Sequence, residues 1–249
     1  PRGGGGMTAR ILRYEIRDEL LGILREPTAL FFSVLMPVGF FALFTAMFSG
    51  QATESPSTVM IVPFGTFGAL AVVLMNPGIG LADARERGWL RVKRVSGTPL
   101  WVTVVAKVLA ATPYAIAVLA AIALASVLIG SMPIDVGQLF RVIAVIVLGA
   151  VPFAGFSLAV GAKAGTNASA AILNAILMPS AIASGLWFPH DLLPGAIARI
   201  GEFLPTYHLA RLAMVQVEGG PWMAHVAVLG ATALIGTLVA AMAYRSARP

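Results

Sequence analysis

Residues 59–81 read VMIVPFGTFGALAVVLMNPGIGL and contain no Asp, Glu, Lys or Arg. A helix needs roughly 20 predominantly apolar residues, at about 1.5 Å each, to cross the hydrocarbon core of a membrane. The run therefore predicts a membrane-spanning helix. Its Asn76 and the later Asn174 are the strongest polar groups in the apolar runs. We expect both to form hydrogen bonds between helices, with contact to a transported substrate as the alternative.

The rest of the chain repeats this pattern. The 249 residues are 58% hydrophobic and 11% charged, with a mean hydropathy of +0.88, whereas soluble domains carry about 25% charged residues. Apolar windows of similar length cover about 28–48, 104–129, 142–161, 170–188 and 222–244. We therefore predict an all-α membrane protein with six transmembrane helices in one domain, residues 7–249. Residues 1–6 are expected to be a vector-derived remnant ahead of a natural start at Met7.

The basic residues predict the orientation. Six spans place both termini on one side, and all but three of the 17 basic residues then fall on that side. The exceptions are Arg141, Arg199 and Arg211. The positive-inside rule makes the terminal side cytoplasmic. We expect a multi-pass protein of a bacterial cytoplasmic (inner) membrane, in contact with the lipid bilayer and not with nucleic acid, because its basic residues lie between apolar runs.

The segment 8–26 differs from the spans. Its apolar residues recur at helical spacing, and Arg13, Glu15, Arg17 and Asp18 take positions between them. This pattern predicts an amphipathic helix. The helix lies either along the cytoplasmic membrane surface or against its own protein, and periodicity favours neither.

The sequence lacks the residues that several kinds of chemistry would require. All 11 acidic residues lie outside the six windows, which disfavours a proton- or sodium-coupled carrier. There is no Cys, and no Gly is followed by Lys, so a phosphate-binding G-x-x-x-x-G-K-[ST] loop is absent. His190, His208 and His225 lack close ligand spacing. We expect no catalytic residue, no metal site and no cofactor on this chain.

Residues 82–100 read ADARERGWLRVKRVSGTPL and connect the second and third windows. The charged start and the apolar Leu90, Val92 and Val95 indicate a short cytoplasmic helix, which Gly97 and Pro99 end. Its basic residues either hold the loop inside and contact anionic lipid, or the helix docks onto a partner. The residues alone do not decide between these roles.

The segment 189–210 precedes the last window and contains Pro189, Pro194 and Pro205. The three prolines break it into pieces that are too short to span. We expect an outer re-entrant helical hairpin that dips into the outer leaflet. Trp187 and Tyr207 are expected at the membrane interface.

In this order within a six-span chain, the two segments resemble the permease subunits of type-2 ABC exporters. One match is an E-R-G-x-L pattern followed by Pro-Leu, carried by Glu86, Arg87, Gly88, Leu90, Pro99 and Leu100. The other is a G-x-x-F-P pattern followed by Leu-Pro and Pro-Thr-Tyr, carried by Gly185, Phe188, Pro189, Leu193, Pro194, Pro205, Thr206 and Tyr207. The amphipathic segment matches the interfacial helix of the family. Residues 92–97 are less apolar than in most relatives.

The resemblance implies a cytoplasmic coupling helix and two partners, a second permease copy and a cytoplasmic ABC ATP-binding subunit that holds ATP and Mg. The dimer, of identical or different chains, would form the pathway for a hydrophobic or amphipathic drug, lipid or glycan-like substrate. The implied coupling residues are Asp83, Arg85, Glu86, Arg87, Gly88, Leu90, Arg91 and Pro99. The implied outer-hairpin residues are Gly185, Phe188, Pro189, Pro194, Pro205 and Tyr207.

Two other functions stay open at this stage. An ATP-independent channel or secondary carrier would need no nucleotide-binding partner. A membrane-embedded enzyme acting on lipids would require Asp191, His190 and His208 to converge at the outer face.

Overall fold

The computed structural model describes residues 4–24, 34–48, 56–90, 100–129 and 134–246. In these residues the regular structure is helical throughout, as predicted. The elements are α1 (Gly4–Leu24), α3 (Met36–Phe48), α4 (Pro56–Glu86), α6 (Leu100–Leu128), α7 (Val136–Ala150), α8 (Phe153–Lys163), α9 (Thr166–Ala183), η2 (His190–Leu192), α10 (Gly195–Gly201), α11 (Pro205–Glu218) and α12 (Met223–Ser246).

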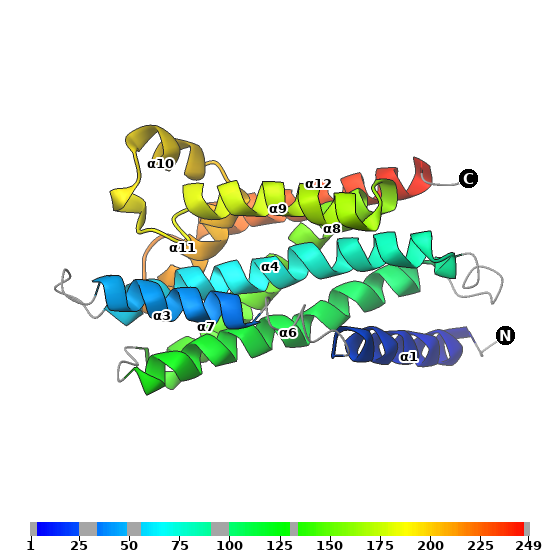
Figure 1. Cartoon of the computed structure of the whole chain (residues 1–249), viewed down its shortest axis with the longest axis horizontal. Helices are drawn as coiled ribbons and strands as arrows, with labels where there is room; N and C mark the ends of the chain where they lie inside the picture. The colour runs from blue at the N-terminus through cyan, green and yellow to red at the C-terminus, as the bar shows by residue number, and fades with distance from the viewer. Residues whose placement is uncertain (1–3, 25–33, 49–55, 91–99, 130–133, 247–249) are drawn as a thin grey trace.

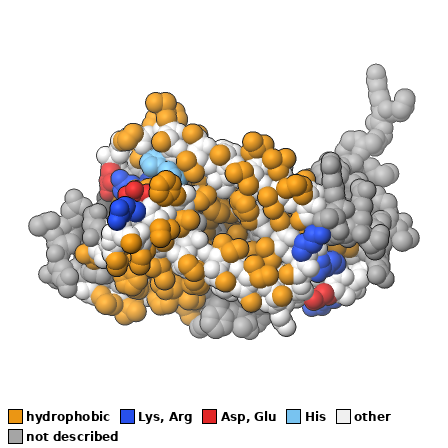
Figure 2. Space-filling model, turned by 90° about the horizontal axis from the view of Figure 1, so that it is seen from above, with side chains coloured by type: hydrophobic (Ala, Val, Ile, Leu, Met, Phe, Trp, Pro, Cys, Tyr) orange, Lys and Arg blue, Asp and Glu red, His pale blue; other side chains and the backbone are white. Residues whose placement is uncertain are grey.

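The long helices run side by side along one axis (Figure 1). The helix α1 and the end of α12 lie at one end of this bundle, whereas α10 lies at the other (Figure 1). We call these the terminal end and the hairpin end. Figure 2 shows apolar side chains across the middle of one face, with charged and His side chains toward the two ends. An apolar belt between charged ends is the distribution expected of a protein that crosses a membrane.

Five segments are long and apolar enough to cross a membrane: Met60–Glu86, Val102–Leu128, Val136–Lys163, Thr166–Ala183 and Met223–Ala243. They correspond to five of the six predicted windows. The first window, 28–48, begins within residues 25–33, which lie outside the described residues. Its described helix, α3, has only 13 residues. The structure therefore supports five spans and leaves the first as a prediction.

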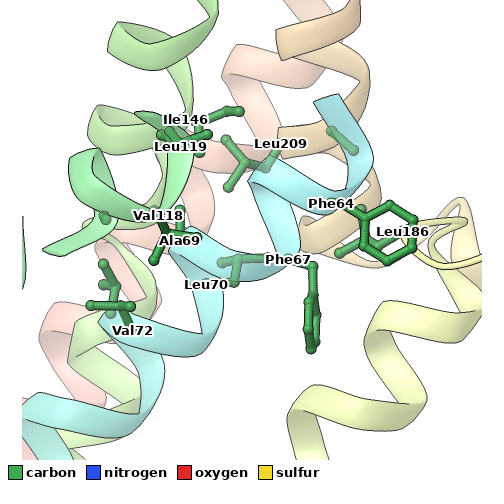
Figure 3. Packing of buried hydrophobic residues seen from close by; sticks show 14 of the residues in the cluster. Phe64, Phe67, Ala69, Leu70, Val72, Val118, Leu119, Ile146, Leu186 and Leu209 are labelled. Atoms are coloured by element: carbon green, nitrogen blue, oxygen red, sulfur yellow. The ribbon is translucent and has the colours of Figure 1, made fainter. Parts of the chain in front are cut away.

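The helix α4 forms the centre of the bundle. It is apolar on all sides, and 78% of its most apolar stretch is buried. It packs against α3, α6, α7, α8, α9 and α11. Phe64, Phe67 and Leu70 are at most 1% exposed, and residues from α6, α7 and α11 surround this part of α4 (Figure 3). The helix continues to Glu86, so the first part of the predicted loop 82–100 is its last turn.

The helices α9 and α12 lie at the periphery, because only 22% and 17% of their most apolar stretches are buried. Asn174 does not form the interhelical bond expected of it. Its side-chain amide is exposed and donates to the carbonyl of Ala170 in α9 itself, at 3.1 Å. A polar amide on an exposed, otherwise apolar helix face is costly in lipid. This face of α9 is therefore a candidate contact for protein or water.

The helix α1 lies alongside the first half of α6 (Figure 1). Tyr114 of α6 donates through its hydroxyl to the carbonyl of Leu20, at 2.8 Å. Tyr14 and three arginines of α1 (Arg10, Arg13 and Arg17) face away and are exposed. Of the two sequence-based alternatives, this arrangement favours a helix packed against its own protein.

Candidate functional site

The last turn of α4 leads into the E-R-G motif. Asp83 and Arg87 form an i, i+4 ion pair, with the carboxylate and guanidinium 2.8 Å apart. The helix ends at Glu86, and the amide of Gly88 donates to the carbonyl of Arg85 at 3.1 Å. Gly88 has a φ of 75°, in the left-handed region that favours glycine. The motif glycine therefore ends α4 and turns the chain.

Arg85 points toward α8. Its guanidinium donates to the carbonyl of Ala162 and, at 2.6 Å, to that of Ala164. The last carbonyls of a helix lack partners within the helix and carry its partial negative charge. A guanidinium suits this position because it is cationic and presents several donors in one plane. Arg85 thus supplies the C-terminal end of α8 with donors from another helix.

Glu86 points toward the start of α9. Its carboxylate accepts from the amide of Thr166 at 3.1 Å and from the hydroxyl of Thr166 at 2.5 Å. The N-cap residue of α9 is Gly165, which has no side chain to cap the helix. A Cβ there would lie 2.5 Å from Oε1 of Glu86. Because residue 165 is glycine, the carboxylate of Glu86 in α4 can come close enough to cap α9. The carboxylate also faces the positive end of the α9 dipole.

These contacts form one unit, the helix-end clamp, made of Arg85, Glu86, Ala162, Ala164 and Thr166. Two adjacent side chains of opposite charge engage two helix ends of opposite partial charge. The clamp fixes the turn between α8 and α9 to the end of α4. A displacement of the chain around Gly88 would therefore reach the first turn of α9 directly.

Of the eight sequence-predicted coupling residues, Gly88 forms the turn after α4, and the other seven fall into four groups. Arg85 and Glu86 bind within their own chain, whereas Asp83 and Arg87 form an exposed pair at the surface. Leu90 packs on the small cluster of Leu81, Leu158 and Ala162. Arg91 and Pro99 lie outside the described residues.

A second polar contact lies one helix away. Lys107 of α6 pairs with Glu19 of α1 at 2.7 Å, and the two side chains are 4% and 23% exposed. Thr103 lies 3.5 Å from Glu15, one turn earlier on both helices. A Cβ at Gly80 of α4 would lie 3.2 Å from the Lys107 amine. The buried amine thus lies where α1, α4 and α6 meet.

At the hairpin end, Gly185 ends α9. Its φ is 75°, and the amides of Gly185 and Leu186 donate to the carbonyls of Ile182 and Ala181, at 3.1 and 2.9 Å. This pairing is a Schellman motif, which needs a left-handed residue at the position of Gly185. Phe188 follows, and its ring lies 5.2 Å from that of Phe44 in α3.

The predicted hairpin consists of short pieces, as its prolines indicate. Pro189 precedes η2, Pro194 is the N-cap of α10, and Pro205 is the first residue of α11. The helix α11 continues to Glu218, beyond the predicted boundary at 210. Each piece is too short to span. Trp187, expected at the interface, packs against Phe40 and Phe67, with ring centres 5.1 and 5.3 Å apart.

Tyr207 lies among the three histidines. Its ring is 5.2 Å from His190, 5.6 Å from His208 and 6.5 Å from His225. The two Nδ1 atoms of His208 and His225 are 2.8 Å apart, so one imidazole donates and the other accepts. Burial lowers the pKa of His208, and a hydrogen bond with the backbone of Glu202 partly opposes this. Among the described residues, no three His, Asp or Glu side chains form a group suited to a metal ion.

Of the residues that a lipid-modifying enzyme would bring together, His190 and His208 both lie against Tyr207, and the structure does not test Asp191. His190 contacts Tyr207 and, through Nε2, the carbonyl of Ala198 at 3.2 Å. His208 pairs with His225, and the side chain of Asp191 lies outside the described residues.

Sequence reasoning missed the partners of the motif residues. Gly165 and Thr166 interrupt the apolar pattern between two windows, which marks a helix start, but nothing in the spacing links them to Glu86. The signal for Lys107 was its position inside an apolar window, since a cation there needs an anionic partner. Glu19 could not be chosen over the other acidic residues of α1 from sequence alone.

Comparison with known proteins found a matching family model and a similar protein. A family model described as ABC-2 type transporter matches residues 12–217, most of the chain. A protein of Bacillus subtilis (strain 168), named "Putative transport permease YvfS", is 23% identical over 212 residues. That alignment covers 84% of this chain and 86% of the relative.

Proposed function

Because this chain belongs to the ABC-2 type transporter family, it is a multi-pass membrane transport permease, and we propose that an ATPase subunit drives export through it. The ATP-binding subunit is a separate cytoplasmic protein that holds ATP and Mg. The transported substrate is hydrophobic or amphipathic, of the drug, lipid or glycan-like class. The six predicted apolar windows hold no acidic residue, and this suits such a molecule better than a small ion.

The helix-end clamp is the observation that carries this proposal. A permease without its own nucleotide site must receive movement from a partner through a surface that connects to the spans. The exposed turn that follows α4, with Arg87 and Trp89, offers such a surface. Behind it, Arg85 and Glu86 hold the turn between α8 and α9. A partner that moves this turn would therefore move α9.

The exposed face of α9 supports a second copy of the permease. Asn167 and Asn174, seven residues apart, share one side of α9, and Ile172, Ile176 and Pro179 are exposed elsewhere around the helix. Polar side chains on a span are expected at protein contacts or along a water-filled pathway, and seldom against lipid. In the proposed dimer, α9 lies between the clamp and the pathway formed by the two copies.

The orientation follows from charge. The clamp lies at the terminal end (Figure 1), and most of the basic residues lie on the terminal side of the predicted topology. We place this end in the cytoplasm of a bacterial cell, with the hairpin at the outer face. Nucleotide would then switch the pathway between its states through a difference in affinity for the two conformations.

The partner is tested directly by isolating the chain from its native membrane in mild detergent, identifying co-purifying proteins by mass and measuring ATP hydrolysis. We expect a nucleotide-binding subunit and an ATPase activity that depends on it. A solitary oligomer without ATPase activity would contradict the proposal and favour a channel or a secondary carrier.

A further inference from the structure

The short helix α8 lies between α4 and α12 and contacts both closely. It follows α7 after a break in the α-helical hydrogen-bond pattern at Val151 and Pro152, both of which keep right-handed helical dihedrals. At this break the amides of Ala154 and Gly155 bond three residues back, to Val151 and Pro152, at 3.0 and 3.3 Å. Proline also lacks an amide hydrogen for the preceding turn. The connection between α7 and α8 is therefore the weakest part of this segment's hydrogen-bond ladder.

On one side, α8 touches the backbone of α4. The amide of Gly78 donates to the hydroxyl of Ser157 at 2.7 Å, and this bond is buried. A Cβ on Gly161 would lie 2.0 Å from the carbonyl oxygen of Gly78, and a Cβ on Gly78 would lie 2.4 Å from the carbonyl oxygen of Ser157. Only glycine permits this approach. The two backbones are thus in direct contact.

The position of this contact along α4 is informative. Gly78 follows Pro77, which interrupts the ladder of α4 and makes bending there easier. The hydroxyl of Ser157 binds the first amide after the interruption. Two turns later, Arg85 binds the last carbonyls of the same helix, α8. The segment of α4 from Gly78 to Arg85 is therefore hydrogen-bonded to α8 at its beginning and at its end.

On its other side, α8 touches the backbone of α12. A Cβ on Gly155 would lie 2.5 Å from the carbonyl group of Gly236, and a Cβ on Gly236 would lie 2.7 Å from the carbonyl oxygen of Pro152. As with α4, any larger residue would push the helices apart. Movement of α8 toward α12 must therefore displace α12. Farther along α8, Ala240 of α12 packs against the cluster of Leu81, Leu158 and Ala162.

We propose that Ser157 is a positioning residue of the transport cycle: it makes α8 move with the end of α4, so that α12 follows while α7 stays behind. The inference rests on the proposed function, because it requires a partner that displaces the end of α4. In this arrangement the segment from Gly78 to Glu86 and α8 form one lever. The break at Val151 and Pro152 is its hinge.

The chain contains no Cys, so pairs of introduced cysteines can carry spin labels without background. Phe140→Cys with Lys163→Cys spans the hinge, and Lys163→Cys with Met242→Cys joins α8 to α12. All three positions are exposed. A single label at Ile176→Cys on α9 reports the distance between two copies. Distances are measured in the assembled complex without nucleotide and with ATP plus vanadate.

We expect nucleotide to change the distance across the hinge and to leave the distance between α8 and α12 unchanged. A hinge distance that stays fixed while the Ile176 label shifts would overturn the inference. So would a changed distance between α8 and α12. If no label shifts and no ATP is hydrolysed, the proposed function itself has failed.

Ser157→Ala then tests the bond. In this variant we expect ATP hydrolysis to persist, while the ratio of shifted to unshifted hinge populations falls roughly tenfold, as expected for one lost buried hydrogen bond. Thr66→Ala is the matched control, because the buried hydroxyl of Thr66 donates to Val62 of its own helix at 2.8 Å. An equal loss in both variants would make Ser157 merely structural. If Ser157→Ala does not assemble, the label pairs with Ser157 intact still decide whether α8 and α12 move together about the hinge.

Discussion

The two ends of the bundle are held by different kinds of contact. At the terminal end, side chains of Arg85, Glu86 and Lys107 bind helices that lie 77 to 88 residues away in the sequence. At the hairpin end, contacts between rings, such as Phe44 with Phe188 and Tyr207 with His190, accompany the hydrogen bonds of His208 with His225 and of Ser184 with Thr206. Hydrogen bonds have a preferred direction and length, whereas ring contacts tolerate sliding. We therefore expect the terminal end to pass on a displacement more directly than the hairpin end does.

The largest effect is expected where an added side chain has no room between the backbones of α4 and α8. Gly161→Ala places a Cβ 2.0 Å from a backbone oxygen of α4, which cannot move aside as a side chain can. We expect a loss of about 3 kcal/mol in the free energy of unfolding, measured by thermal denaturation in detergent. Gly230→Ala in α12 meets nothing within 4 Å and is the matched control. It should be neutral or stabilising by roughly 0.5–1 kcal/mol. Equal midpoints for both variants would show that α4 and α8 are not in backbone contact.

A somewhat smaller effect is expected from a broken charge pair. Lys107→Met leaves Glu19 without its partner, and we expect a loss of about 2 kcal/mol, less than for a fully buried pair because Glu19 is 23% exposed. Adding Glu19→Leu should restore stability to within about 1 kcal/mol of the original chain. Arg87→Ala breaks the exposed pair with Asp83 and should cost less than about 1 kcal/mol. The double variant decides: no recovery would mean that Lys107 stabilises α1 by some contact other than this pair.

The smallest effect is expected at the hairpin end, as a dependence on pH. The pKa of His208 is lowered by burial, so the folded chain binds its proton less well than the unfolded chain does. The stability from this group is complete above the ordinary His pKa of 6.5 and declines as pH falls below it. Unfolding midpoints between pH 8 and pH 5, compared with those of His208→Gln, measure the effect. The variant should show a shallower slope, and parallel slopes would rule out the His208 contribution.

The sequence predicted the helical class, five of the spans and the division of the segment 189–210 into short pieces, because these depend on local pattern. Apolar length marks a span, and the prolines at 189, 194 and 205 each stand at the start of an element, whereas Pro63, Pro77, Pro113 and Pro179 lie inside helices. The extension of α4 to Glu86 was missed because its last turn is charged. Charge lowers the predicted membrane preference but does not end a helix.

The partners of the candidate site could not be predicted in the same way. The motif marked Arg85 and Glu86, but their contacts depend on how α8 and α9 pack against α4. The same limit applies to Asn174, whose spacing fits an interhelical bond although its helix face is exposed in this chain. Which face of a span is buried depends on tertiary packing. The sequence of a helix that is apolar on all sides gives little indication of that face.

The most direct test of the clamp is a spin label at Ile176→Cys in the complex assembled with its ATPase, with Glu86 intact or replaced by Ala. With Glu86 intact, we expect ATP and vanadate to change the distance between the two copies. In Glu86→Ala, ATP hydrolysis should continue while this change is lost, because α9 no longer receives its cap from α4. An unchanged nucleotide response in Glu86→Ala would contradict the role of the clamp as the link between the partner and the pathway.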